Sequence, residues 1–318
     1  MTRLFLRRVI QLPLILLAVY TLTFILTWLI PGSPLEKAEA RQPPPEVMAA
    51  MQAQYSLDDP WDFYWDYLGS ATGVSWLLGE RNGPIFDLGP SLRHENWSVN
   101  EILASQLPIS MALGLMAIMI ACVIGIISGT LAAARPGSWL DLMSLLIALI
   151  GISLPAFVTG TALLMVGGLW LDLFPVSGWG RPVHLILPSL ALSLPFAAYI
   201  SRLVRVGMLE QMASDHVRLL RSLGLSERTI LIKHALRNAF LPVLSYLGPA
   251  TAAAMTGSFV VERVFAVPGV GNHFVEAVLG KDITLIMGVV LVYSVLLVMF
   301  NLAVDLLYGW IDPRIRLA

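Results

Sequence analysis

The stretch Glu210–Leu244 reads EQMASDHVRLLRSLGLSERTILIKHALRNAFLPVL, a basic, helix-forming segment between long apolar ones. The chain has 318 residues, of which 57% are hydrophobic and 13% are charged. Soluble domains are about 45–50% apolar and about 25% charged, so most of this chain is expected to lie in a lipid bilayer. A charged loop beside a membrane is either an anchor on anionic lipid or a docking surface for a soluble partner.

Local signals inside this loop predict two helices joined by a tight turn. Val217, Leu220 and Leu223 recur at i, i+3 and i+6, which favours one shared helix face. Gly224 follows, and glycine is the residue expected where a helix ends in a left-handed turn. Ser226 is a suitable N-cap for a second helix. We therefore expect a rigid segment rather than a flexible loop.

The second helix is predicted to lead directly into the membrane. Thr229–Phe240 continues it, and Pro242 is expected to begin the next span, where its missing N–H is harmless. The turn should carry an apolar knob formed by Leu220, Leu223, Gly224 and Leu225. A lipid anchor needs a long apolar stripe, whereas a compact knob suits a groove on a partner.

Six segments are long and apolar enough to cross about 30 Å of hydrocarbon as helices. They are Val9–Ile30, Pro108–Ala134, Leu140–Leu171, Leu185–Val206, Leu241–Val261 and Ile283–Leu307. The first is too long for the apolar region of a signal peptide, which spans about 7–15 residues, so we expect it to be retained. The fold class predicted is an all-α membrane protein with six transmembrane helices.

Helix breakers occur in three of these segments. Gly151, Pro155 and Gly160 should tilt or break the third, while Pro188 and Pro195 are expected to interrupt the fourth. The fifth is punctuated by Pro242, Gly248, Pro249 and Gly257. These breakers have two possible roles. They either curve the helices, which then pack closely through small residues, or they line a bent transport pathway. In the second case Pro155 and Pro195 are candidate pathway residues.

Loop charges predict the orientation. Lysine and arginine gather at both termini, in the loop after the second span and in the long charged loop, all on one side of six crossings. Both termini are therefore expected in the cytoplasm. The first outer loop, Pro31–Asn100, is acidic and aromatic. Its segment Trp61–Leu68 is predicted to be a helix that serves as an interfacial anchor or as a platform for an extracytoplasmic protein.

The charged loop resembles the cytoplasmic loop with the "EAA" signature of bacterial ABC-importer permeases, in the version of the dipeptide/oligopeptide branch. Leu219 and Leu220 stand where that signature has alanines, and Arg218 stands where it has glutamate. Further resemblances lie in order along nearly the whole chain. They are Phe5–Arg8, Ile30–Pro34, Tyr55–Pro60, Val260–Gly271, Asp305–Tyr308 and Asp312–Arg316. Pro44–Met48, Ser98–Asn100 and Leu244–Pro249 resemble the oligopeptide subunit more than the dipeptide one.

The resemblance implies the type-I ABC importer permease fold in a bacterial inner membrane. Residues 207–241 then form the coupling loop that docks on a cytoplasmic ATPase, within a core of residues 101–310. Residues 1–30 form the N-terminal transmembrane helix, 31–100 the extracytoplasmic loop, and 311–318 the cytoplasmic tail. The coupling residues implied are Arg218, Leu220, Arg221, Leu223, Gly224, Leu225, Ser226, Arg228, His234 and Arg237.

The partners follow from the same resemblance. They are a homologous second permease, two ABC ATPase subunits and an extracytoplasmic peptide-binding protein. The chain is expected to be no enzyme and to bind no cofactor, because a G-x-x-x-x-G-K-[ST] phosphate loop is missing from its sequence and ATP is left to the partners. A formal net charge of -1 argues against nucleic-acid binding.

Other functions stay open. Dipeptide, nickel or glutathione cargo is compatible with the family, and a stand-alone secondary transporter or a membrane scaffold is the alternative outside it. Glu262 and Arg263, at the outer end of the fifth span, form either a gate or a structural ion pair at a helix end. Asp305 in the last span is a candidate pathway residue, or one that snorkels or pairs with an arginine.

Overall fold

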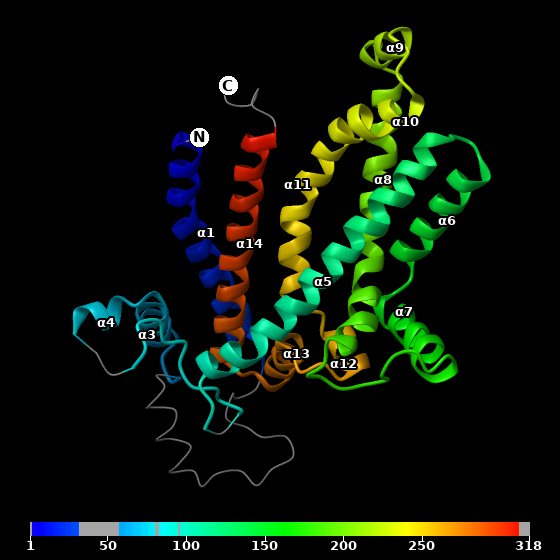
Figure 1. Cartoon of the computed structure of the whole chain (residues 1–318). Coiled ribbons are helices and arrows are strands. Elements are labelled where there is room, and N and C mark those ends of the chain that lie inside the picture. Colours follow the sequence, from blue (N-terminus) through cyan, green and yellow to red (C-terminus); the bar gives the residue numbers. More distant parts are fainter. Residues whose placement is uncertain (1, 32–56, 80–82, 95, 312–318) are drawn as a thin grey trace. The chain divides into compact units, whose positions relative to one another are not determined.

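A computed structural model describes residues 2–31, 57–79, 83–94 and 96–311. These residues form helices and connecting turns, with one isolated antiparallel β-bridge between Pro90 and Ser98 (Figure 1). The chain divides into two compact units. Unit 1 comprises Met1–Phe5, Ile109–Pro268 and Leu297–Ala318, and unit 2 comprises Leu6–Pro108 and Gly269–Leu296.

The longest helices of the described chain coincide with its apolar segments. The long ones are α1 (Thr2–Leu29), α5 (Val99–Ala134), α8 (Ile186–Met212), α11 (Leu236–Met255) and α14 (Ile283–Ile311). The shorter α-helices are α3 (Pro60–Thr72), α4 (Val74–Leu78), α6 (Trp139–Ser153), α7 (Ala156–Leu163), α9 (Asp215–Ser222), α10 (Glu227–Thr229), α12 (Phe259–Phe265) and α13 (Val270–Gly280). The described residues also contain the short π-helical segments η1 (Leu164–Trp170) and η3 (Ile230–Ala235) and the 3₁₀-helical η2 (Pro182–Leu185).

Four of these helices are long and apolar enough to cross a membrane, and two bent helix pairs raise the number to six within the described residues. The first pair is α6 with α7 and η1, bent by 111°. The second is α10 to α11 with α12, bent by 50°. The predicted break of the third span is confirmed, and it falls at Leu154 and Pro155, where the backbone turns to an extended conformation.

The prolines of the fourth and fifth spans do not act as predicted. Pro188 lies in the first turn of the continuous helix α8 and Pro195 lies inside it, so the expected interruption of the fourth span is wrong. Pro242 lies inside α11 and does not begin a span. The break in the fifth span falls at Gly257, which was one of its predicted breakers and whose φ of 84° suits glycine. A membrane helix tolerates a proline when neighbouring groups satisfy the freed carbonyls.

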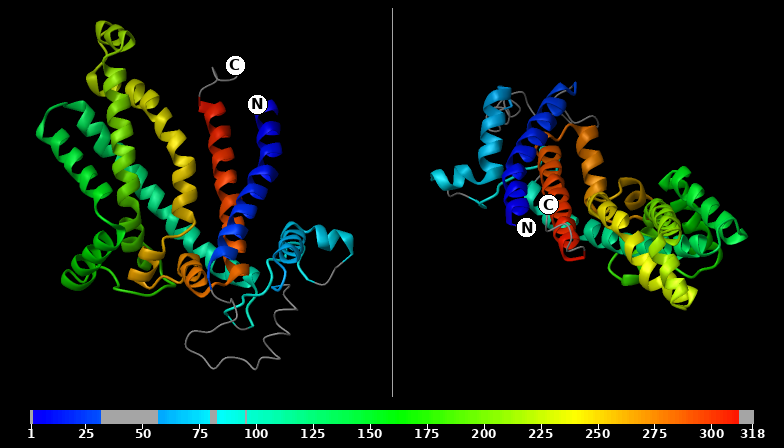
Figure 2. Two further views of the ribbon diagram at one scale, coloured as in Figure 1. Left: turned by 180° about the vertical axis from the view of Figure 1, so that it is seen from behind. Right: turned by 90° about the horizontal axis from the view of Figure 1, so that it is seen from above.

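The core of unit 1 is built on close helix packing around α8, which packs against α6 and α11 (Figure 2). The α5 sequence Gly125-Ile-Ile-Ser-Gly129 supplies a small-residue face. A Cβ on Gly125 would lie 2.7 Å from the Cβ of Ile200 in α8, and one on Gly129 would lie 2.5 Å from the carbonyl oxygen of Ser201. This spacing is the small-xxx-small pattern that lets two membrane helices approach closely.

A charged pair fixes α6 to α8 near one end of unit 1. Arg205 donates two hydrogen bonds to Asp141, from Nε at 2.5 Å and from Nη2 at 2.9 Å. The Asp141 carboxylate is buried and also accepts a hydrogen bond from the backbone N–H of Gly137, at 2.9 Å. Bidentate arginine–carboxylate contacts of this kind fix both the distance and the relative orientation of the two side chains.

Unit 2 has an aromatic core between α1 and α3. Tyr20 and Phe24 of α1 pack with Phe63, Tyr64 and Tyr67 of α3, and all five are buried. The Tyr20 hydroxyl donates to the carbonyl oxygen of Tyr64 at 2.6 Å. The predicted helix over Trp61–Leu68 is therefore confirmed, and several of its aromatic residues belong to the core of the unit.

Candidate functional site

The elbow, which we define as Ser214–Ser226, lies beyond the ends of α8 and α11 in unit 1 (Figure 1). The connection between α5 and α6 lies at this same end, while α7 and α12 lie at the other (Figures 1 and 2). Helix α8 ends at Met212, and Ser214 caps a new helix, α9, by accepting a hydrogen bond from the N–H of Val217 at 3.4 Å. The predicted shared face of Val217, Leu220 and Leu223 did not locate this break, although Ser214-Asp215 is a typical N-cap followed by an acidic first turn.

The turn at Gly224 has the hydrogen bonds of a Schellman motif. The N–H of Gly224 donates to the carbonyl of Arg221 at 3.0 Å, and the N–H of Leu225 donates to that of Leu220 at 3.2 Å. Gly224 has a φ of 78°, and a Cβ placed there would meet no atom within 4 Å. Glycine is required at this position by the backbone conformation and not by a neighbour. The predicted glycine turn is confirmed.

The chain leaves the turn as one long helix. Ser226 caps it by accepting a hydrogen bond from the N–H of Thr229 at 3.3 Å, as predicted. The helix continues through α10 and η3 into α11 and so reaches the membrane span without a joint. His234 on this helix lies against His216 of α9, with ring centroids 5.9 Å apart. The elbow is therefore held at both of its ends.

The elbow has its own small core. Val217, Leu220 and Ile230 are buried together, and Leu225 packs against them. Leu219 and Leu223 are instead exposed, by 56% and 66%. The predicted knob is therefore wrong in part, because Leu220 and Leu225 face inward and an exposed leucine, Leu219, was not included. Residues at i and i+4 share a helix face, so Leu219 and Leu223 form the outward apolar surface.

Exposed charges surround this apolar surface. Arg221 donates to Glu227 from Nε at 2.7 Å and from Nη2 at 3.2 Å, which closes the turn from outside. Arg218 pairs with Asp215 at 3.0 Å. Both pairs are exposed and add little to stability. Arg228 and Arg237 are exposed as well. The predicted coupling residues from Arg218 to Arg228 thus lie on the elbow and at the start of the next helix, whereas His234 and Arg237 lie farther along that helix.

The candidate gate and pathway residues lie apart from the elbow. Pro155 is exposed at the bend between α6 and α7, and Pro195 is exposed within α8. Glu262 is 1% exposed in α12 and accepts a hydrogen bond from the Ser110 hydroxyl at 2.8 Å, whereas the adjacent Arg263 is exposed. Asp305 lies in α14, and its side chain is outside the described part of the chain.

Comparison with known proteins places the chain in a family. The family model described as "Binding-protein-dependent transport system inner membrane component" matches residues 121–317. The chain belongs to this family. A second model, for the N-terminal part of such membrane components, matches residues 1–114. As a binding-protein-dependent inner membrane component, the chain is a transport subunit rather than an enzyme, and it resides in the inner membrane.

Curated relatives of this inner membrane component match over nearly their full length. The chain is similar to the dipeptide transport system permease protein DppB of Bacillus subtilis, at 40% identity over 318 residues, covering 100% of this chain and 99% of that protein. It is also similar to the oligopeptide transport system permease protein OppB of Haemophilus influenzae, at 38% identity and 93% coverage of each chain. OppB of Escherichia coli is 37% identical, with 99% of this chain and 100% of that protein covered.

One solved structure supports the fold. It is described as the inward-facing MetNI methionine ABC transporter, and its matching chain superposes with a TM-score of 0.54 at 18% identity. The match covers 66% of this chain and 96% of that chain. The predicted fold class, an all-α type-I ABC importer permease, is confirmed by this match together with the family model.

Proposed function

We propose that this chain is a permease subunit of an ATP-driven peptide importer. The observation that carries the proposal is the match over the whole chain to permeases named for dipeptide and oligopeptide transport. We favour oligopeptides as the cargo, because three short motifs of this chain resemble the oligopeptide subunit. The relatives include both kinds at nearly the same identity, so the uptake experiment below includes peptides of two lengths.

The chain is proposed to work with several partners. They are a homologous second permease, two cytoplasmic ABC ATPase subunits and an extracytoplasmic peptide-binding protein. The family description, which names binding-protein-dependent transport, supports the last of these. ATP is bound and hydrolysed by the ATPase subunits, because the sequence of this chain has no phosphate-binding loop of the Walker type.

The elbow is proposed to face the cytoplasm, together with both termini. The elbow and the α5–α6 connection lie at one end of unit 1, and both carry exposed arginines, such as Arg221 and Arg135. Positive charge in short loops marks the cytoplasmic side. The opposite end, with α7 and α12, then faces outward, and Glu262 and Arg263 lie there as candidate gate residues.

The elbow is proposed to be the coupling element. Leu219 and Leu223 would enter a groove on an ATPase subunit, and the surrounding charges would set the orientation. Gln211, at the end of α8, accepts a hydrogen bond from Asn238 in α11 at 3.1 Å. Because the elbow joins α8 to α11 without a flexible linker, a displacement of the elbow moves both spans, which suits alternating access by rocking of packed helices. Pro155, Pro195 and Asp305 remain candidate pathway residues.

Gly224→Val tests the coupling role, with Gly137→Val as its matched control. Gly137 lies in the α5–α6 connection at the same end of unit 1 and has a φ of 74°, and a Cβ placed there would also meet no atom within 4 Å. Each substitution strains a left-handed residue by at least about 1–2 kcal/mol. If docking requires the native turn, this strain reduces the docked population about 5- to 30-fold for Gly224→Val alone.

The measurement is uptake of a radiolabelled dipeptide and a radiolabelled pentapeptide into proteoliposomes that contain the chain with its partners, together with ATP hydrolysis. We expect Gly224→Val to take up much less peptide per ATP hydrolysed than the wild type. Gly137→Val should keep the wild-type ratio. Equal uptake by the two variants would overturn the coupling role while leaving peptide transport intact. If the wild-type assembly takes up neither peptide, the peptide proposal itself is overturned.

A further inference from the structure

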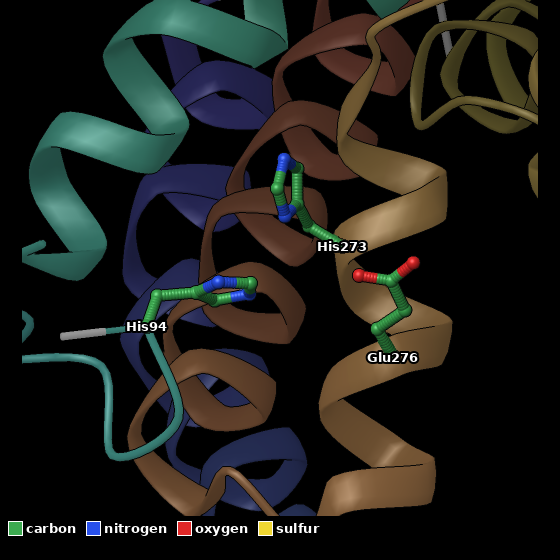
Figure 3. Close-up of side chains that lie close together, drawn as sticks. All are labelled: His94, His273 and Glu276. Atoms are coloured by element: carbon green, nitrogen blue, oxygen red, sulfur yellow. The ribbon is translucent and has the colours of Figure 1, made fainter. Parts of the chain in front are cut away.

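Two histidines and a glutamate of unit 2 converge at a place that transport coupling does not use. His94 comes from the segment that precedes α5, and His273 and Glu276 come from α13. Figure 3 shows the two α13 side chains on one face of the helix, with the ring of His94 approaching them from the neighbouring segment. Residues at i and i+3 share a helix face, so α13 presents a His-x-x-Glu pair to His94.

The geometry of this cluster is that of a candidate metal site. One ligand atom from each residue lies within 4.8 Å of the other two. The two imidazole rings are 5.2 Å apart at their centroids and nearly perpendicular, at 78°. Three nitrogen and oxygen donors at such distances are typical of a site that one divalent ion can occupy.

Two of the donors have unmet hydrogen-bonding capacity. Nε2 of His94 and Nδ1 of His273 are buried and have no hydrogen-bond partner. A buried polar atom without a partner is destabilising, and such atoms are uncommon in folded proteins. A metal ion accepts the lone pair of a neutral imidazole nitrogen, so it would remove this cost for both histidines at once.

We propose that His94, His273 and Glu276 bind one divalent transition-metal ion, with zinc the preferred occupant. Imidazole and carboxylate are ligands that zinc accepts, and three protein ligands leave a fourth tetrahedral position for water. Magnesium and calcium are disfavoured because they prefer a shell made of oxygen ligands alone. The site joins the segment before α5 to α13 within unit 2, and so acts as a cross-link.

Binding requires only a small closure of the three side chains. Bonds of about 2.0–2.1 Å in a tetrahedral arrangement place ligand atoms roughly 3.4 Å apart, up to about 1.4 Å nearer than the separation of up to 4.8 Å seen here. Rotation about side-chain bonds supplies a movement of this size.

Zinc binding to the full-length chain tests the proposal. The chain is purified in detergent without a polyhistidine tag, and its zinc affinity is measured by competition with a chromophoric chelator. We expect one zinc ion per chain. His94→Ala, His273→Ala and Glu276→Gln should each weaken binding by at least about tenfold, which is the lower end of the loss seen when even an indirect metal partner is removed.

His184→Ala is the matched control, because His184 lies in η2 of unit 1 and outside the cluster. It should bind zinc like the wild type. Each variant must elute as a monodisperse species, and the absorption spectrum of Co²⁺ in the wild-type chain reports tetrahedral coordination independently of the variants. Wild-type protein that binds no zinc, or cluster variants that bind zinc as tightly as His184→Ala, would overturn the proposal.

Discussion

Gly224 in the elbow and Gly125 in α5 are both positions that favour glycine, and for opposite physical reasons. At Gly224 the backbone is left-handed, with φ at 78°, and the space around the position is open. At Gly125 the helix is regular, but a Cβ would lie 2.7 Å from Ile200 and 2.8 Å from the carbonyl oxygen of Ala197. One glycine shapes a turn, and the other lets two helices touch.

The difference separates a surface from an interior. Around Gly125 the contacts that determine stability are made within unit 1, in the cluster that joins α5, α8 and α11. Around Gly224 the turn is satisfied by its own hydrogen bonds, and Leu219 and Leu223 remain exposed beside it. The elbow is thus a rigid turn with exposed apolar side chains. Such a surface is suited to contact with another protein.

The largest effect is expected from Gly125→Val. The added methyl groups must displace Ile200 and the backbone of α8, and overpacking of this kind costs about 1–3 kcal/mol or more. We expect a clear fall in the temperature at which half of the detergent-purified protein stays monodisperse. Val123→Ile adds bulk on the exposed face of the same helix and should leave that temperature nearly unchanged. Equal stability of the two variants would mean that α5 and α8 are not in close contact.

A smaller effect distinguishes the two leucines of the elbow. Leu220 is 8% exposed and belongs to the elbow core, whereas Leu223 is 66% exposed. Leu220→Ala should destabilise the elbow by about 2 kcal/mol, while Leu223→Ala should stay within about 0.5 kcal/mol. Hydrogen exchange of the backbone amides of residues 214–226 measures this difference. Exchange should be at least roughly tenfold faster in Leu220→Ala, and similar rates in both variants would show that the elbow has no core of its own.

Much of this fold could be predicted from periodicity and length. Four of the apolar segments appear as single long helices and two as bent helix pairs. The break near Pro155, the left-handed turn at Gly224 and the cap at Ser226 also follow from local rules and are confirmed. Local rules succeed here because helix ends and turns are decided by residues within a few positions of each other.

The errors arose where distant residues decide the outcome. Pro195 and Pro242 were expected to interrupt or start helices, but both lie inside helices whose continuity depends on packing. Val217 and Leu223 are six residues apart, which is about 120° of rotation away from a common face, so only the first of them is buried. The contact of Gly125 with α8, and the meeting of His94 with α13, join segments far apart in the sequence and could not be located from a single chain.

The central claim, that the elbow is covered by an ATPase subunit, is tested most directly by cysteine labelling. Cys122 is the only cysteine of the chain, so Cys122→Ala provides a background without thiols. Leu223→Cys is introduced in the elbow, and Arg135→Cys, in the exposed α5–α6 connection at the same end, is the control. Reaction with a hydrophilic maleimide is followed with and without the ATPase subunits. We predict that the ATPase subunits slow labelling at residue 223 at least about tenfold and leave residue 135 reactive. Unchanged labelling at residue 223 in the assembled transporter would contradict the account.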